Sequence, residues 1–289
     1  MRFIHTFNSK PLLKEKFNKY EALLDVILND YAYSATCCKK HGYDIILYTD
    51  KLGAKMLSHI DYNEVIILDL PDEGHFAASI KFEAIKNMTK DDVLIDGDLF
   101  IQNKKAFELI ESYNNYDFVY SFYEPNHFVI ADGKALNMYK DMFNVFNKNK
   151  SVFKKPFELI KEYSELEWPN TSLMKFNNQK LKKEYLQQYF YFLYKLFHLD
   201  FGNTWPDIII EQFHMKKLLE YGKYTSKAII DNFPKPEAND FALEIGFTHL
   251  GSGKIYHNDY FKQKFKALNP ILFEKTQKQV ELYKSLISK

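Results

Sequence analysis

The chain has 289 residues, of which 46% are hydrophobic, with 39 basic and 38 acidic side chains. This composition excludes a disordered chain and is sufficient for one large α/β domain or two small ones. The near balance of charge argues against broad electrostatic attraction to nucleic acid, so we expect no nucleic-acid partner.

The first half of the chain alternates predicted strands and helices. Short apolar runs predict strands at 2–7, 43–50, 64–70 and 93–95, and apolar residues at three- and four-residue steps predict helices at 12–40 and 77–88. Such alternation predicts βαβ units and an α/β fold with a mixed, mostly parallel central sheet flanked by helices.

The pattern loosens after residue 115. We expect strands at 116–125, 127–132 and 167–178, helices at 136–146, 180–199, 204–222 and 259–289, and a short glycine-punctuated loop within 246–256. The last helix should break at Asn269–Pro270, and no repeat or clear linker divides the chain. These features predict a single domain with a helical C-terminal region.

The two cysteines, Cys37 and Cys38, are adjacent within a predicted helix. Neighbouring cysteines rarely close a sound disulfide and no zinc-binding spacing is present, which fits a reducing compartment. Polar residues interrupt the apolar residues of the first ten positions, so no secretory signal is expected. No run of about 18 apolar residues predicts a membrane span. We therefore expect a cytoplasmic protein.

The predicted strand at 93–95 ends in the acidic segment Asp96–Asp98, which has glycine at its centre. Two carboxylates at the tip of a hydrophobic strand are costly to leave unpaired, and their oxygens suit Mg²⁺ or Mn²⁺. Ligands of parallel sheets bind outside the carboxyl ends of the strands, where Thr6, Thr49 and Asp50 should also lie. Because a D-x-D is common by chance, a structural turn remains the alternative interpretation.

A second segment, THLGSGK at 248–254, combines an imidazole, two glycines and an ammonium group. A neutral His249 can complete the coordination shell of Mn²⁺. Gly251 and Gly253 allow backbone N–H groups to approach a diphosphate, and Lys254 can neutralise its charge. The alternative is an exposed Gly-Ser turn with a bystander histidine and lysine.

Together the two segments resemble the GT-A glycosyltransferases, the nucleotide-diphospho-sugar transferases, and most of all the glycogenin and bacterial galactosyltransferase group. That group has a nucleotide pocket at its first strand, a D-x-D after its fourth strand and a late H-x-G-x-x-K. The segment His249–Lys254 matches the last pattern at all four fixed positions. Departures are Ile255-Tyr256 in place of the usual Pro-Trp, and Pro169–Ser172 in place of F-N-[ST]-G.

The resemblance implies a GT-A (Rossmann-like) fold over residues 1–289. Its nucleotide-sugar-binding half would be 1–105, followed by an acceptor-side half at 106–256 that carries the closing metal and diphosphate loop, and by a C-terminal helical segment at 257–289. It also implies a metal-dependent, retaining transfer from a nucleotide-diphospho-sugar, with a UDP-sugar as the expected donor, to a glycan or other hydroxyl acceptor.

The resemblance further implies that Asp98 and His249 hold Mn²⁺, or Mg²⁺, and that Asp96 contacts the metal or the ribose. The expected donor-binding residues are Thr6, Phe7, Thr49, Asp50, Lys81, Asp96, Asn170, Gly251, Gly253 and Lys254. Lys81 could reach the donor from its helix, or it could be an ordinary solvated lysine.

Asp207, Glu211 and Gln212 are the candidate catalytic residues. They start a helix at the position where many GT-A enzymes carry an acidic residue near the sugar, and Asp207 and Glu211 share a helical face. The alternative is the ordinary acidic pattern of a helix N-terminus.

Three other functions stay open. A nucleotidyltransferase of related fold would also use acidic groups at a strand end with Mg²⁺, and a non-catalytic protein could bind a nucleotide sugar or glycan without turnover. A phosphohydrolase resembling the haloacid dehalogenases would need its glycine after the second aspartate and its motif near the first strand.

Overall fold

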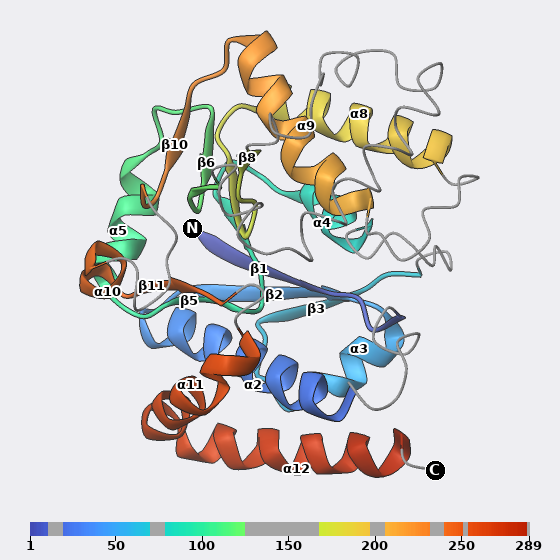
Figure 1. Ribbon diagram of the computed structural model, residues 1–289, viewed down its shortest axis with the longest axis vertical. Coiled ribbons are helices and arrows are strands. Elements are labelled where there is room, and N and C mark those ends of the chain that lie inside the picture. Colours follow the sequence, from blue (N-terminus) through green and yellow to red (C-terminus); the bar gives the residue numbers. More distant parts are fainter. Residues whose placement is uncertain are drawn as a thin grey trace.

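The computed structural model describes residues 1–10, 20–69, 79–124, 168–196, 206–231, 240–250 and 254–287 (Figure 1). Its central sheet has seven strands, in the order β10 (Ser226–Ala228), β6 (Phe118–Tyr120), β9 (Leu173–Phe176), β4 (Asp92–Ile95), β1 (Arg2–Phe7), β2 (Asp44–Thr49) and β3 (Glu64–Ile67). Of these seven strands, only β9 runs antiparallel to its neighbours. The expected Rossmann-like, mixed and mostly parallel sheet is thus confirmed.

Helices cover both faces of the sheet, and the two faces have separate hydrophobic cores (Figure 1). One face packs against α2 (Tyr20–Lys40), over which α11 (Lys254–Leu268) and α12 (Pro270–Ile287) lie. The other face packs against α4 (Ser79–Asn87), α8 (Gln179–Leu196) and α9 (Pro206–Gly222). The expected helical C-terminal region is therefore present, with its break at Asn269.

The double coverage explains the continuous apolar runs of the central strands. Along β1, Phe3 packs into the core beneath α2, whereas its neighbour Ile4 packs into the core beneath α4 and α8. Val93 and Leu94 of β4 are divided between the two cores in the same way. Successive side chains of a strand point to opposite faces, so a strand covered on both sides must be apolar throughout.

Several predicted elements were wrong in their extent. The segment 246–256, which we expected to include a short loop, also contains β11 (Phe247–His249) and the start of α11, because β11 pairs antiparallel with β5 (Leu99–Ile101) in a separate two-stranded ribbon. Residues 251–253 of this segment lie outside the described residues. The strands expected at 116–125 and 167–178 are each divided, since β7 (Tyr123–Glu124) pairs with β8 (Trp168–Pro169) outside the main sheet.

Three short helices and two strands have no counterpart in the sequence prediction. They are α3 (Lys51–Met56), α5 (Lys104–Ser112), α10 (Asp240–Ile245), β5 and β10. The strand expected at 127–132 and the helix expected at 136–146 lie outside the described residues.

The order of the strands places a topological switch point between β1 and β4. From β1 the chain builds β2 and β3 on one side and then returns to place β4 on the other side of β1. In an open α/β sheet, the carboxyl ends of two such strands frame the usual ligand-binding crevice. The ends of β1 and β4 are Phe7 and Ile95, so Asp96 begins beside this crevice.

Cys37 and Cys38 are both buried and free, as expected from their adjacency. Among the described helices, none combines the length and the apolar character needed to cross a membrane. Two histidines, His5 and His214, are fully buried in the interior. Burial lowers the pKa of each of them to about 3, so both are neutral near pH 7.

The buried His214 predicts a loss of stability in mild acid. Between pH 6.5 and 3 the unfolded state binds a proton that the folded state cannot, so the free energy of unfolding falls as pH falls. From pH 7 to pH 5, wild type should therefore lose about 2 kcal/mol more than His214→Phe, as measured by urea unfolding. Tyr185→Phe changes the ring stacked on His214 but removes no imidazole, so it should keep the wild-type pH dependence. Equal pH dependence in wild type and His214→Phe would contradict a neutral buried imidazole.

Candidate functional site

The acidic segment Asp96–Asp98 forms the tight turn between β4 and β5. The amide of Leu99 donates to the carbonyl of Asp96 at 3.0 Å, and the amide of Asp96 donates to the carbonyl of Ser172 on the neighbouring chain segment at 2.8 Å. The turn is therefore anchored at the carboxyl end of β4, at the crevice beside β1.

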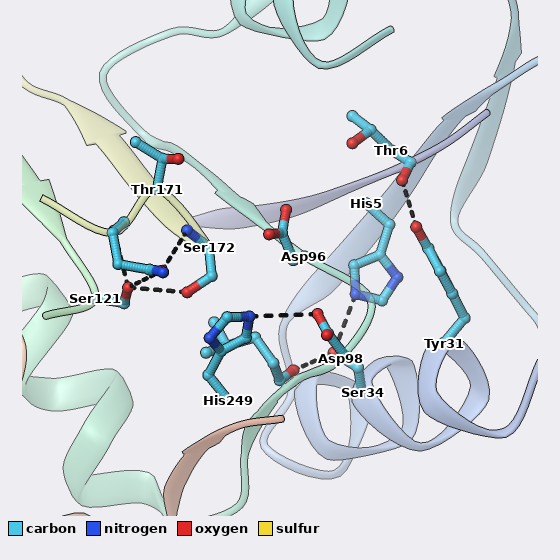
Figure 2. Close-up of polar contacts among 12 residues, drawn as sticks. His5, Thr6, Tyr31, Ser34, Asp96, Asp98, Ser121, Thr171, Ser172 and His249 are labelled. Carbon is cyan, nitrogen blue, oxygen red and sulfur yellow. Dashed lines mark hydrogen bonds and ion pairs between the residues drawn. The ribbon is translucent and has the colours of Figure 1, made fainter. Parts of the chain in front are cut away.

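Gly97 allows this turn to lie directly against an aromatic ring. A Cβ atom at Gly97 would be 2.3 Å from Cε2 of Tyr31 on α2. The Tyr31 ring is held in place because its hydroxyl donates to the carbonyl of Thr6 at 2.5 Å (Figure 2). Glycine is needed here for close approach to Tyr31, a reason that the sequence pattern did not reveal.

His249 reaches the acidic turn because β11 pairs with β5. In that ribbon His249 lies opposite Leu99, the residue after Asp98, and the amide of Leu250 donates to the carbonyl of Asp98 at 3.1 Å. The Nε2 atom of His249 is 3.5 Å from Oδ1 of Asp98 (Figure 2). Two segments 150 positions apart in sequence thus meet at one point.

The group Asp96, Asp98 and His249 has the donor chemistry of a divalent-cation site. Each residue offers one ligand atom, and these atoms all lie within 4.8 Å of one another. Ligands at about 2.1 Å from an octahedral ion are roughly 3 Å apart when adjacent and 4.2 Å apart when opposite, so the fit needs only small side-chain rotations. The Nδ1 atom of His249 is buried with no hydrogen-bond partner among the described residues. Two carboxylates and one imidazole suit Mn²⁺ or Mg²⁺.

The electrostatics of the site favour an added positive charge. Burial alone would lower the pKa of His249, but the charge and hydrogen bond of Asp98, with the charges of Asp96 and Glu124, outweigh burial and raise it. Burial also raises the pKa of Glu211, and Asp96 adds to the increase while Lys81 opposes it. Two carboxylates, Asp96 and Glu211, contact the ammonium of Lys81, and Asp98 and Glu124 act on His249, so a cation at this point would offset excess negative charge.

Lys81 is buried in the site, and the alternative of a solvated lysine is wrong. Its ammonium lies 3.0 Å from Oδ1 of Asp96 and 2.6 Å from Oε1 of Glu211, and it donates to the carbonyl of Thr171 at 2.9 Å. Burial lowers the pKa of Lys81, but the two carboxylates outweigh this effect and raise it. An ammonium group has three N–H donors, and all three are used. Lys81 therefore positions Asp96 and Glu211, and this arrangement leaves it no N–H for the donor.

The side chain of Asn170 makes three hydrogen bonds within the described part of the protein. Its Oδ1 accepts from the amide of Ser172 at 2.9 Å and from the hydroxyl of Ser121 at 2.8 Å, and its Nδ2 donates to Oε1 of Glu124 at 2.7 Å. The other oxygen of Glu124 accepts from the indole N–H of Trp168 at 2.6 Å. Glu124 is thus a rigidly held carboxylate near His249 that the sequence interpretation missed. Its position at the end of a predicted strand was the available signal.

Thr49 and Asp50 make structural hydrogen bonds, and their expected contact with the donor stays a prediction. Asp50 caps the N-terminus of α3 by accepting from the amides of Leu52 and Gly53, and it also accepts from the amide and hydroxyl of Ser9. Thr49 is fully buried and donates to the carbonyl of Phe7 at 2.7 Å. These contacts hold β1, β2 and α3 together, so both side chains have a structural role in the fold.

The remaining expected residues are placed as follows. Thr6 and Phe7 end β1 beside the acidic turn, and both are buried. Glu211 joins the site through Lys81, and the hydroxyl of Thr171 donates to its carboxylate. Gln212 is half-buried, and its Oε1 has no hydrogen-bond partner among the described residues.

Two expected site residues are only partly described, and two are not described. Asp207 lies in the first turn of α9, and Lys254 is the first residue of α11 instead of a loop residue. Gly251 and Gly253 lie outside the described residues. Diphosphate binding by this segment therefore stays a prediction from sequence. The segment ends at Lys254, where α11 begins.

Comparison with known proteins adds no assignment. No protein-family model matches this chain, and no curated protein is significantly similar to it. The interpretation of the site therefore depends on its own geometry and charge.

The Lys81 network predicts a strong energetic coupling. Lys81→Met leaves the buried carboxylate of Glu211 and the half-buried carboxylate of Asp96 without their ammonium, which should cost about 3 kcal/mol of unfolding free energy. Adding Glu211→Gln should recover part of this loss, so the double variant should be less destabilised than the sum of the single variants. Chemical denaturation of the four proteins measures the cycle. Lys86→Met, on the exposed side of the same helix, should be near neutral, and strict additivity of the cycle would refute the coupling.

Proposed function

We propose that this protein is a metal-dependent glycosyltransferase that transfers a sugar from a nucleotide-diphospho-sugar to a hydroxyl acceptor. The observation that carries the proposal is the convergence of Asp96, Asp98 and His249 at the carboxyl ends of β1 and β4. Neither the acidic segment nor its position at the end of a strand would by itself indicate a cation site. Their combination puts a cation-binding group in the crevice where α/β sheets bind nucleotides.

The arrangement supports the resemblance to the GT-A glycosyltransferases. The D-x-D follows the fourth strand of the chain, and the histidine of the late H-x-G-x-x-K segment lies beside it. The sheet is the mixed, mostly parallel type expected for that fold.

In this proposal Asp98 and His249 hold Mn²⁺ or Mg²⁺, and Asp96 contacts either the metal or the ribose. When bound, such a cation supplies Lewis-acid stabilisation of the charge that develops on a departing nucleoside diphosphate. Lys81 holds Asp96 and Glu211 in fixed positions, so neither carboxylate must reorganise when substrate binds. The catalytic assignment favours Glu211 because it is the buried carboxylate tied to the metal-ligating segment.

The donor and acceptor follow from the resemblance alone. A UDP-sugar is the expected donor, a glycan or another hydroxyl compound is the expected acceptor, and retention of configuration is the expected stereochemistry. A panel of UDP-, GDP-, CMP- and dTDP-sugars, tested by thermal shift with and without Mn²⁺, identifies the nucleotide because a bound donor raises the melting temperature.

The reaction products distinguish the alternative functions. Mn²⁺-dependent hydrolysis of the donor, or transfer to an added acceptor, supports a transferase, whereas binding without turnover favours an inert binding protein. Release of pyrophosphate from a nucleoside triphosphate supports a nucleotidyltransferase. The phosphohydrolase interpretation is disfavoured because glycine lies between the two aspartates and the segment follows the fourth strand.

The proposed metal ligands make a direct prediction. Asp98→Ala and His249→Ala should each abolish the Mn²⁺-dependent part of the thermal shift caused by the donor, since each removes a ligand from the cluster. Asp91→Asn, an exposed carboxylate just before β4, should respond like wild type. If both site variants keep the full Mn²⁺-dependent shift, the metal assignment is wrong.

Lys254 makes a separate prediction for the diphosphate. Lys254→Ala should weaken nucleoside diphosphate binding roughly tenfold, since it removes one charge-assisted contact, while Mn²⁺ binding stays largely intact. Calorimetric titration with a nucleoside diphosphate, with and without Mn²⁺, measures both effects. Unchanged diphosphate affinity in a folded Lys254→Ala protein would exclude Lys254 from the site.

A further inference from the structure

The ribbon of β5 and β11 borders a second hollow, distinct from the metal cluster. This pocket has a volume of about 130 Å³ and lies among the end of β5, the turn before β11, and α11. Thr248 lines it, whereas the next residue, His249, faces Asp98. Successive side chains of a strand point to opposite faces, so the pocket and the metal cluster lie on opposite sides of β11.

The pocket is polar and of a size that suits a small molecule. A cavity of roughly 150 Å³ holds a six-carbon ring, so this pocket accepts a ligand of about six non-hydrogen atoms. The Nε2 atom of Gln102 donates to the hydroxyl oxygen of Thr248 at 3.1 Å, while its Oε1 accepts from the hydroxyl of Tyr33 at 3.3 Å. The hydroxyl hydrogen of Thr248 is thereby left for a further acceptor.

The pocket also contains a lysine with no acidic partner among the described residues. The ammonium of Lys264 donates to Oε1 of Gln102 at 3.3 Å and lies 4.6 Å above the ring of Tyr260 and 5.8 Å from that of Phe261. A neutral amide and two aromatic rings stabilise this ammonium without cancelling its charge. Its remaining N–H groups and the hydroxyl of Thr248 form a donor set for an anion.

We propose that this pocket binds a small oxyanion, of the carboxylate or the phosphate and sulfate type, between Lys264 and Thr248. Such an anion would connect α11 to β11. The ribbon of β11 and β5 has three residues in each strand, and so short a ribbon has little stability by itself. An anion that bridges Lys264 and Thr248 therefore stabilises the strand that carries His249.

The same geometry couples the pocket to the metal cluster. Stabilising β11 reduces the cost of holding His249 beside Asp98, so the bound anion tightens Mn²⁺ binding, and Mn²⁺ tightens anion binding by the same factor. This second part depends on the proposed metal site, whereas anion binding itself does not.

The first experiment measures anion binding to the metal-free protein. Sodium sulfate and sodium acetate, compared with sodium chloride at equal ionic strength, test tetrahedral and planar oxyanions separately by thermal shift and calorimetry. At least one of them should give a saturable rise in melting temperature. Asp98→Ala should keep this rise, because the pocket lies on the other face of β11.

Matched variants locate the anion. Lys264→Met should lose the rise while keeping a wild-type circular dichroism spectrum in chloride, and Thr248→Val should weaken binding at least fivefold. Lys266→Met, an exposed lysine on the same helix, should respond like wild type. Equal stabilisation by chloride, or a wild-type response in Lys264→Met, would overturn the anion site.

The second experiment measures coupling through the free Mn²⁺ signal in electron paramagnetic resonance. The effective anion at saturation should tighten Mn²⁺ binding about fivefold in wild type and leave it unchanged in Lys264→Met. Unchanged Mn²⁺ affinity in a protein that binds the anion would overturn the coupling. Intact anion binding without any Mn²⁺ binding would refute the proposed metal site and the coupling, yet support the anion site.

Discussion

The constraint on which the site depends is the concentration of carboxylates around a single buried lysine. Lys81 contacts both Asp96 and Glu211, while Asp98 and Glu124 add further negative charge beside His249. Gathering four carboxylates in a partly buried site is unfavourable unless positive charge compensates them, and they carry more charge than Lys81 and a protonated His249 supply. A divalent cation is the simplest compensation, and its binding would make use of electrostatic strain that the fold already contains.

The side chains of the site come from separate elements of the fold. Asp96 follows β4, Glu211 lies on α9, Glu124 ends β7, and His249 ends β11. Their partners are equally dispersed, since Lys81 belongs to α4 and the carbonyl that it contacts belongs to Thr171, before β9. The site is thus a junction between the two halves of the chain, and its geometry depends on the packing of the whole sheet.

The tyrosine beneath the acidic turn illustrates how local sequence and tertiary packing cooperate. Tyr31 lies on the helix that covers one face of the sheet, and its hydroxyl is bonded to β1. Its ring occupies the place that a side chain at Gly97 would need. On the opposite side of the ribbon, the pocket lies between Lys264 of α11 and Thr248 of β11, the strand that carries His249. Movement of the short β11 strand would therefore displace both His249 and the pocket residue Thr248.

The sequence by itself determined the alternation of strands and helices, the mixed parallel sheet, and the location of Asp96–Asp98 at a strand end. Apolar periodicity is local, and a strand covered on both faces is readable as a continuous apolar run. Only the tertiary structure decided that His249 lies on a strand, that Lys81 is buried between two acids, that Glu124 belongs to the site, and that Asp50 is a helix cap. Each of these depends on contacts between residues far apart in the chain, and a short segment such as β11 becomes a strand only because β5 supplies its partner.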